Sequence, residues 1–327
     1  MEFRPIERAP GAFQRSVTAE QLQAMCRRAF GAGVRLNSAV ELGLGAYNST
    51  YRVMLEGHRP VILRVAPEPD RQFRIERALM RNEHATAAYL AGLGRLLPRT
   101  LAVDFTHQLI GRDYLFQTLL DGVAAPEGLS RYPRPAWAPF FGQLGGIART
   151  IHDVGGSRFG MVAGPTYATW SQALIGYFDD AAADLRDAGL DADDARQLAV
   201  AADRHRAVLD EISTPRLLHG DLWTVNVLID PDAPEPRITG VVDSDRAWWG
   251  DPPADWTIYC AQRRQGAEHQ AFFDRYGRLP AGDHDRLRAR FYLARHLLAI
   301  RLERFRLGDT EFSATYDDVR EVLAGLA

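Results

Sequence analysis

The chain has 327 residues, of which 46% are hydrophobic, and a formal net charge of −3. A chain of this length can bury a large core and usually divides into two domains or lobes. The near-neutral charge gives no sign of a nucleic-acid partner. The start of the chain lacks an apolar signal core, and no apolar run of about 20 residues could span a bilayer, so we expect a cytoplasmic protein without a membrane partner.

All 39 basic residues are arginine, and lysine is absent from the chain. The two cysteines, Cys26 and Cys260, lie far apart in sequence and form neither a disulfide framework nor a metal-binding pattern. We expect both to be small buried side chains. The sequence contains no signal for an oligomeric state.

The first third of the chain predicts a small antiparallel sheet with helices. Thr18 and Gln21 have the spacing of a capping box, and Gly31 is a suitable end for the helix that follows. We expect strands within residues 41–57 and 59–67, a long helix over 72–92, and a further strand over 114–120. An apolar strand meets a turn signal at residues 119–122, so we place a first lobe at 1–121 and a second at 122–327.

The second lobe is mainly helical. Two short strands are expected near residues 226–229 and 238–242. Helical periodicity of apolar residues is present over residues 139–154, 169–185, 193–212 and 284–306. An antiparallel sheet in one lobe and helices in the other define an α+β fold class.

The two short strands carry polar residues at their ends. The stretch LLHGDLWTVNVLID, residues 217–230, contains Asp221 and Asn226, and the second strand runs into Asp243. If the strands form a hairpin, these three side chains come together as a set of hard oxygen ligands suited to Mg²⁺. Phosphoryl transfer needs such a site, together with a carboxylate that accepts the proton of the attacking hydroxyl. The alternative is three ordinary turn residues.

The pattern H-G-D-L-x-x-x-N, followed by an apolar strand and V-V-D, resembles the catalytic centre of the aminoglycoside phosphotransferase family, which is related to the protein kinases. The stretches NEHATAAYL (82–90), GGIARTIHDV (145–154) and GDPPADWTIY (250–259) resemble further parts of that family in the same order. The resemblance covers about residues 38–260. It implies a bilobal, protein-kinase-like fold with a small antiparallel-sheet lobe and a larger, mainly helical lobe.

By this resemblance Asp221 is the catalytic residue, and Asn226 and Asp243 are the Mg²⁺ ligands. We expect His219 to brace the loop and Asp255 to accept hydrogen bonds from buried backbone groups around it. For Asp245 two interpretations stay open. It either contacts the metal ligands without binding the metal itself, or it is a solvent-exposed carboxylate on the loop.

The resemblance also implies a nucleotide site in the first lobe. Gly43 and Gly45 would cover the phosphates with help from Ser49, although an ordinary β-turn has the same pattern. Arg64 stands where the family usually has lysine, with Glu83 as its preferred partner and Glu76 as the alternative. At the hinge the purine of ATP or GTP would contact Gln117, Thr118 and Leu120.

These features predict a Mg²⁺-dependent O-phosphotransferase. It would move the γ-phosphate of ATP or GTP to a hydroxyl of a small molecule, with an antibiotic as the first candidate acceptor. A metabolite kinase for a sugar, amino alcohol, homoserine or fructosamine-like substrate is the second hypothesis, and a catalytically silent binding protein is the third. The acidic stretch at residues 179–194 suits a cationic acceptor and the aromatic residues at 248–259 suit a ring-bearing one. The alternatives are a solvated helix face for the first and core packing for the second, so neither feature decides the acceptor.

A protein kinase is disfavoured, because only six residues separate Asp243 from Gly250. That length is too short for an activation segment that binds a peptide.

Overall fold

The structure is a computed structural model, and it describes residues 2–43 and 45–326. Contacts between Cα atoms divide the chain into two compact units. Unit 1 consists of Met1–Gln72 and Pro98–Leu120, and unit 2 of Phe73–Leu97 and Asp121–Ala327. The segment Phe73–Leu97 therefore groups with the second unit, whereas the sequence had placed it in the first lobe. Its helix α2 (Leu79–Thr86) packs against the turn at Ser244–Arg246, which explains the grouping.

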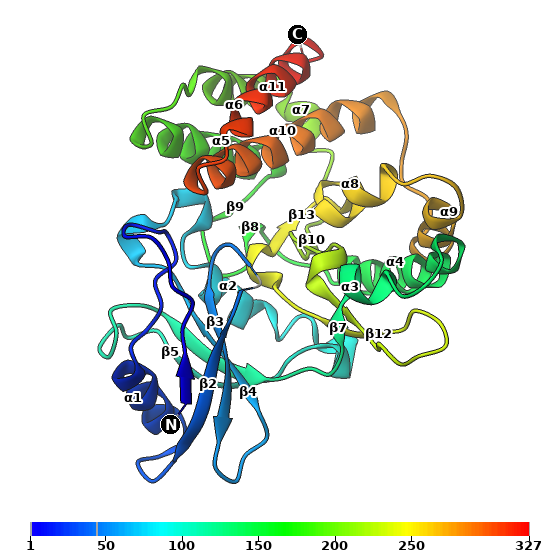
Figure 1. Cartoon of the computed structure of the whole chain (residues 1–327). Helices are drawn as coiled ribbons and strands as arrows, with labels where there is room; N and C mark the ends of the chain where they lie inside the picture. Colours follow the sequence, from blue (N-terminus) through cyan, green and yellow to red (C-terminus); the bar gives the residue numbers. More distant parts are fainter. Residues whose placement is uncertain (1, 44, 327) are drawn as a thin grey trace. The chain divides into compact units, whose positions relative to one another are not determined.

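The described residues of unit 1 form a six-stranded sheet and the helix α1 (Figure 1). Among these strands β1 and β2 are parallel, and the other neighbouring pairs are antiparallel. Helix α1 (Ala19–Phe30) begins at Thr18 with the predicted capping box and buries Leu22, Met25 and Cys26 against the sheet. In sheet order the strands are β1 (Glu2–Arg4), β2 (Leu36–Leu42), β3 (Ser49–Leu55), β4 (Val61–Val65), β6 (Tyr114–Thr118) and β5 (Thr100–Asp104).

The long helix predicted over residues 72–92 is wrong. The chain forms 3₁₀ turns at Pro69–Arg71 and Arg74–Glu76, then the short helix α2, and then a 3₁₀ segment at Ala91–Leu96. Ala78, immediately before α2, has a left-handed backbone with φ 58°, which no continuous right-handed helix can contain. Asn82 also joins α2 to the rest of unit 2, because its Nδ2 donates to the carbonyl oxygens of Asp245 and Ala247 at 2.8 and 2.9 Å.

Unit 2 contains two small sheets. One has the order β12 (Ile238–Val241), β11 (Val227–Ile229), β7 (Val123–Ala124). The other has the order β10 (Arg216–Leu218), β13 (Trp248–Gly250), β8 (Phe159–Met161), β9 (Thr166–Tyr167). Both sheets consist of antiparallel pairs. The predicted strands correspond to β11 and β12, but the four-stranded sheet was not predicted, because its strands have only two or three residues.

The remainder of unit 2 is helical. The predicted helices are present, except that the one expected over 193–212 stops at Arg204 and continues as a separate short turn. The fold class is α+β as predicted. The helices are α3 (Ala125–Leu129), α4 (Ala138–His152), α5 (Trp170–Asp187), α6 (Asp193–Arg204), α7 (Arg206–Leu209), α8 (Trp256–Gln262), α9 (Gly266–Tyr276), α10 (Asp283–Arg306) and α11 (Ala314–Ala324).

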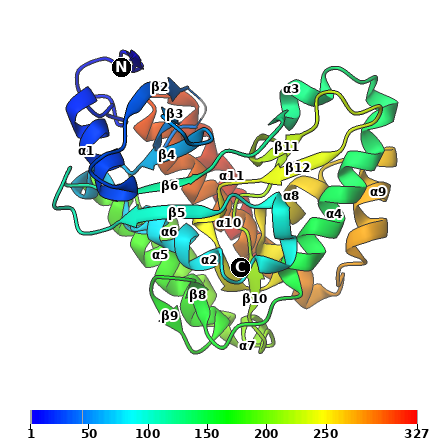
Figure 2. The same cartoon turned by 90° about the horizontal axis from the view of Figure 1, so that it is seen from below.

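The helices of unit 2 form two groups. Helices α4 and α9 lie side by side (Figure 2), and they approach closely at Gly145, where an added Cβ would lie 2.2 Å from the carbonyl oxygen of Phe272. Helices α5, α6, α10 and α11 pack on one another in the second group. Within the described residues, no helix has the length and apolar character needed to cross a membrane.

Candidate active site

The β11–β12 hairpin positions the polar residues that the sequence singled out. Val227 pairs with Val241, and the Val242 N–H donates to the Asn226 carbonyl at 3.0 Å, so Asn226 and Asp243 lie at the same end of the hairpin. The Asn226 Nδ2 donates to the Asp221 carbonyl at 2.8 Å and to its Oδ2 at 2.9 Å. Because the amide nitrogen is engaged, the Oδ1 atom of Asn226 is the one left to bind a cation.

The Asp221 carboxyl lies in a protected environment. Burial raises its pKa to about 8, and the Asp243 charge acts in the same direction, whereas Arg246 and the Asn226 hydrogen bond favour the ionised form. A buried carboxyl with increased proton affinity is a common feature of groups that accept a proton in catalysis. The side chain is therefore chemically suited to the predicted role.

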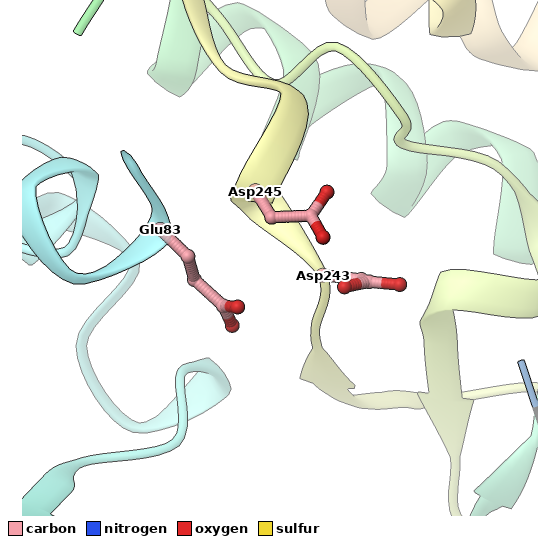
Figure 3. Close-up of side chains that lie close together, drawn as sticks. All are labelled: Glu83, Asp243 and Asp245. Atoms are coloured by element: carbon pink, nitrogen blue, oxygen red, sulfur yellow. The ribbon is translucent and has the colours of Figure 1, made fainter. Parts of the chain in front are cut away.

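Three carboxylates gather beside Asp221 and Asn226. Glu83 on α2 faces Asp243 and Asp245, and one ligand oxygen from each lies within 4.8 Å of the others (Figure 3). Asp245 is 4% exposed, so it does not lie solvated on the loop. Asp243 adopts a left-handed backbone with φ 67°, a strained conformation for a residue other than glycine. Together with Asn226 Oδ1, this set fits a hard cation such as Mg²⁺.

The location of Glu83 bears on the expected pair with Arg64. Glu83 belongs to unit 2 and Arg64 to unit 1, so the pairing stays a prediction. The alternative partner, Glu76, is held within unit 2 by Arg246 at 2.9 Å and by Arg306. A sequence signal for the carboxylate cluster did exist, because Asp243 and Asp245 are two residues apart in D-S-D.

The loop before Asp221 is held by Asp255. Its Oδ2 accepts from the His219 backbone N–H at 2.7 Å, and its Oδ1 accepts from that of Gly220 at 3.0 Å. This confirms the predicted role of Asp255. His152, at the end of α4, lies 2.9 Å from the same carboxylate through Nε2. Burial lowers the pKa of His219, whose ring is fully buried and has no hydrogen-bond partner for either nitrogen among the described residues.

Gly220 fixes the loop sterically. Its backbone has φ 82°, and an added Cβ would lie 2.0 Å from the carbonyl oxygen of Arg246. Any side chain there would push the loop away from the segment that carries Asp243 and Asp245. The glycine of the H-G-D motif is therefore required by a close backbone approach.

In unit 1 the predicted phosphate-covering loop connects β2 and β3. Gly43 is exposed, and Gly45 has φ 103°. Gln14 braces this loop, because its Nε2 donates to the carbonyl oxygens of Gly45 at 3.2 Å and Asn48 at 2.9 Å. The Ser49 hydroxyl is buried and donates to a backbone carbonyl, so its proton is already engaged.

The other residues expected at the nucleotide lie on β4, on β6 and at the end of unit 1. Arg64 is buried in β4 opposite Leu115, and Gln117 is buried in β6. The Thr118 N–H donates to the Arg99 carbonyl at 3.0 Å. Its own carbonyl and the backbone of Leu120, the last residue of unit 1, are the groups proposed to contact the base.

The acidic stretch at residues 179–194 is engaged in internal ion pairs. Asp184 is buried and accepts from Arg74 at 2.9 Å, and Asp194 forms a bidentate pair with the fully buried Arg301 at 2.9 and 2.7 Å. Charges neutralised in this way are poor anchors for a cationic acceptor. Among the aromatic residues, Trp248 lines a pocket beside Gly220.

Comparison with solved structures shows the same fold in known proteins. The wild-type aminoglycoside 2'-phosphotransferase-IIIa in complex with GDP has 18% identity and a TM-score of 0.60, over 94% of this chain and 98% of that one. A thermostable mutant of aminoglycoside phosphotransferase APH(4)-Ia has 19% identity and a TM-score of 0.62, over 93% and 99%. Another variant of APH(4)-Ia has been solved with AMP-PNP and hygromycin B. No curated protein matches the chain.

The structures show a shared kinase-like fold, and the family assignment rests on sequence. A family model described as "Phosphotransferase enzyme family" matches residues 38–290. That range includes the H-G-D loop, the β11–β12 hairpin and the carboxylate cluster. The chain belongs to the phosphotransferase enzyme family.

Proposed function

We propose that this protein transfers the γ-phosphate of ATP or GTP to a hydroxyl group of a small molecule. The observation that carries the proposal is the convergence of Asp221, Asn226 and Asp243 at one end of the β11–β12 hairpin, with Glu83 and Asp245 beside them. A catalytically silent relative would have no need for this full set. Relatives solved with GDP, or with AMP-PNP and hygromycin B, support a nucleotide donor and an antibiotic acceptor.

Each residue has a distinct part in the transfer. The acceptor oxygen attacks the γ-phosphorus, the bond to the β–γ bridging oxygen breaks to release the nucleoside diphosphate, and the hydroxyl proton passes to Asp221. Asn226 holds Asp221 in place through its Nδ2. Mg²⁺, when bound, neutralises the phosphate charge, and Asp243 and Asn226 Oδ1 would hold it with Asp245 and Glu83 nearby.

In unit 1, Gly43 and Gly45 would cover the phosphates and Arg64 would bind them through its planar guanidinium. That group forms paired hydrogen bonds with phosphate oxygens, which a lysine cannot reproduce.

The proposal is tested by incubating the protein with Mg²⁺, γ-labelled ATP or GTP, and a panel of hydroxyl-bearing antibiotics and metabolites. We expect one acceptor class to gain a single phosphoryl group by mass. Excess chelator and Asp243→Ala should both abolish transfer, whereas Asp232→Ala, an exposed aspartate at the tip of the same hairpin, should not.

Each outcome of the panel has a defined meaning. Phosphorylation of a metabolite without any antibiotic would favour the metabolite kinase. Nucleotide binding without transfer to any acceptor would favour the silent binding protein. Full turnover in excess chelator would overturn the proposed cation site.

A further inference from the structure

A second polar feature of unit 2 lies in a pocket beside the H-G-D loop. The pocket is a cavity of about 40 Å³ within a hollow of roughly 410 Å³ that includes open solvent, and Gly220, the residue before Asp221, forms part of its wall. Apolar side chains contribute much of the lining, including Leu79, Met161 and Trp248. Two arginines, Arg246 and Arg295, are the charged residues of the lining.

The two arginines differ in how their charge is compensated. Arg246 is paired with Glu76 at 2.9 Å and lies 3.7 Å from Glu303. Arg295, on α10, is 7% exposed. No carboxylate oxygen of the described residues lies within 4.0 Å of its guanidinium nitrogens, so it forms no ion pair there. Its Nε is fully buried and has no hydrogen-bond partner in the described part of the chain. Arg295 is therefore a buried cation without a direct ion-pair partner among the described residues, and the Asp255 charge acts on it only from further away.

Aromatic rings hold Arg295 in place. The guanidinium carbon lies 4.5 Å from the Trp248 ring centroid and 5.0 Å from that of Tyr177. The faces of both rings attract a cation, but they satisfy none of its N–H donors. Burial lowers the pKa of Arg295, in line with the cost of removing a charge from water. Buried polar groups are nearly always hydrogen-bonded, so an exception at a pocket is a signal of function.

A neighbouring residue provides a second unsatisfied polar group. His296 lines the same pocket, and its buried Nε2 has no partner among the residues that the structure describes. Burial lowers the pKa of His296 to about 3, with the nearby Arg295 charge acting in the same direction, so its ring is neutral at physiological pH. A neutral imidazole can donate or accept one hydrogen bond beside the arginine.

We propose that Arg295 binds a carboxylate on the phosphate acceptor, and that the preferred acceptor is therefore a hydroxy acid with an apolar body. This inference rests on the proposed function and narrows its acceptor. The planar guanidinium matches a carboxylate through two parallel N–H···O bonds, and such a pair supplies both charge and orientation. Gly220, the residue before Asp221, lines the same pocket as Arg295, so an acceptor anchored there would lie beside the H-G-D loop.

The experiment measures binding without nucleotide, so it is independent of transfer. Three probes share one skeleton with a phenyl ring and a hydroxyl: 3-phenyllactate, its neutral amide, and 1-amino-3-phenylpropan-2-ol, which carries an ammonium group instead. Calorimetry on the unmodified protein should rank the carboxylate first and the ammonium compound last. Equal affinities, a preference for the ammonium compound, or no binding of 3-phenyllactate at millimolar concentration would overturn the proposal.

Variants identify the residue responsible. Arg295→Met should weaken 3-phenyllactate binding by about tenfold or more and leave the amide unaffected, and Arg295→Lys should recover part of the loss. Arg290→Met, which removes an exposed arginine from the same helix, is the matched control and should bind as the parent does.

A structural role for Arg295 predicts a different melting temperature from a binding role. If Arg295 binds a ligand, Arg295→Met removes an uncompensated buried charge, and the melting temperature should stay unchanged or rise. If Arg295 is a structural contact, the melting temperature of Arg295→Met should fall. Unchanged 3-phenyllactate affinity in a folded Arg295→Met protein would assign the residue to packing. If 3-phenyllactate binds through Arg295 but no acceptor is ever phosphorylated, the proposed function fails and the carboxylate site stands. If the Arg295→Met protein and the parent phosphorylate cationic acceptors equally well, the proposed function stands and the carboxylate site fails.

Discussion

At the scale of single residues, Asp221 and Asn226 act as a pair. The amide of Asn226 donates to both the carbonyl and the carboxylate of Asp221, so one side chain fixes the rotamer of the other. Its oxygen is free of that contact, so in the proposed function one asparagine would serve both the proton acceptor and the cation.

The role of Asp221 predicts a specific kinetic defect. Asp221→Asn keeps the shape and can still accept a hydrogen bond from Asn226, but the amide cannot take a proton. We expect kcat to fall on the order of 10²-fold or more with nucleotide affinity little changed. Steady-state kinetics with the acceptor found in the panel would measure this, with Asp232→Asn as the control. A folded variant with near-normal kcat would show that another group accepts the proton.

Arg64 allows a second test at this scale. Arg64→Ala should raise the nucleotide KM and lower kcat, because the phosphates lose both a charge and an orienting group. Arg64→Lys should restore only part of the activity, since an ammonium group cannot form the paired contact. Arg52→Ala, an exposed position on the neighbouring strand β3, serves as control. Parental kinetics in Arg64→Ala would show that this strand does not hold the phosphates.

At the scale of elements, the H-G-D loop is stabilised from three sides. Asp255 accepts from the backbone of His219 and Gly220, and His152 reaches the same carboxylate from the end of α4. On the third side, the Arg246 carbonyl oxygen approaches Gly220 so closely that an added Cβ would lie 2.0 Å from it. Few of these contacts involve the reacting groups, yet together they determine where Asp221 is placed.

Asp255 makes the stability of this loop dependent on pH. Burial alone would raise the pKa of Asp255, but the hydrogen bond and charge of His152, with the contribution of His219, lower it to about 2. The unfolded chain has an aspartate pKa near 3.9. The stability contributed by the ionised carboxylate is therefore fully present above about pH 4 and is lost as the pH falls through about 2.

This shift corresponds to about 2–3 kcal/mol of unfolding free energy. Urea unfolding at several pH values between 5 and 2 should show a steeper loss for the parent than for Asp255→Asn, which cannot titrate. The exposed substitution Asp232→Asn should keep the parental slope. Identical slopes for the parent and Asp255→Asn would contradict the assigned pKa.

At the scale of the whole molecule, each unit has its own apolar core, and unit 2 contains a buried ionic network as well. Arg301 on α10 is fully buried, pairs with Asp194 on α6, and donates through Nε to the Thr315 hydroxyl of α11 at 2.9 Å. One guanidinium thus joins three helices. These helices belong to the group that also carries Arg295.

Removal of Arg301 should be strongly destabilising. Arg301→Met leaves Asp194 without its counter-ion, and we expect a loss of about 3–5 kcal/mol in unfolding free energy. Adding Asp194→Leu to that variant should recover part of the loss, because no isolated charge then remains. Arg304→Met, one turn further along α10 and more exposed, should change stability by roughly 0.5 kcal/mol or less. Equal effects of the two single substitutions would refute the structural role of Arg301.

The sequence by itself determined the α+β class, the helix capped by Thr18, the β11–β12 hairpin and the presence of Asp221, Asn226 and Asp243 at its end. These features depend on local signals: apolar periodicity, capping residues and a motif within ten residues of a turn. It also indicated Asp255 as the support of the loop, because the stretch GDPPADWTIY resembles the corresponding part of the family.

Only the tertiary structure decided the remaining features, since each depends on residues far apart in sequence. The long helix expected over 72–92 breaks at Ala78, because the contacts of Asn82 with the segment after Asp243 outweigh local helical propensity. The position of Glu83 beside Asp243 and Asp245 follows from the same packing. The uncompensated charge of Arg295 is equally invisible in the sequence, because an arginine in a charged helix looks like any other until its burial and its neighbours are known.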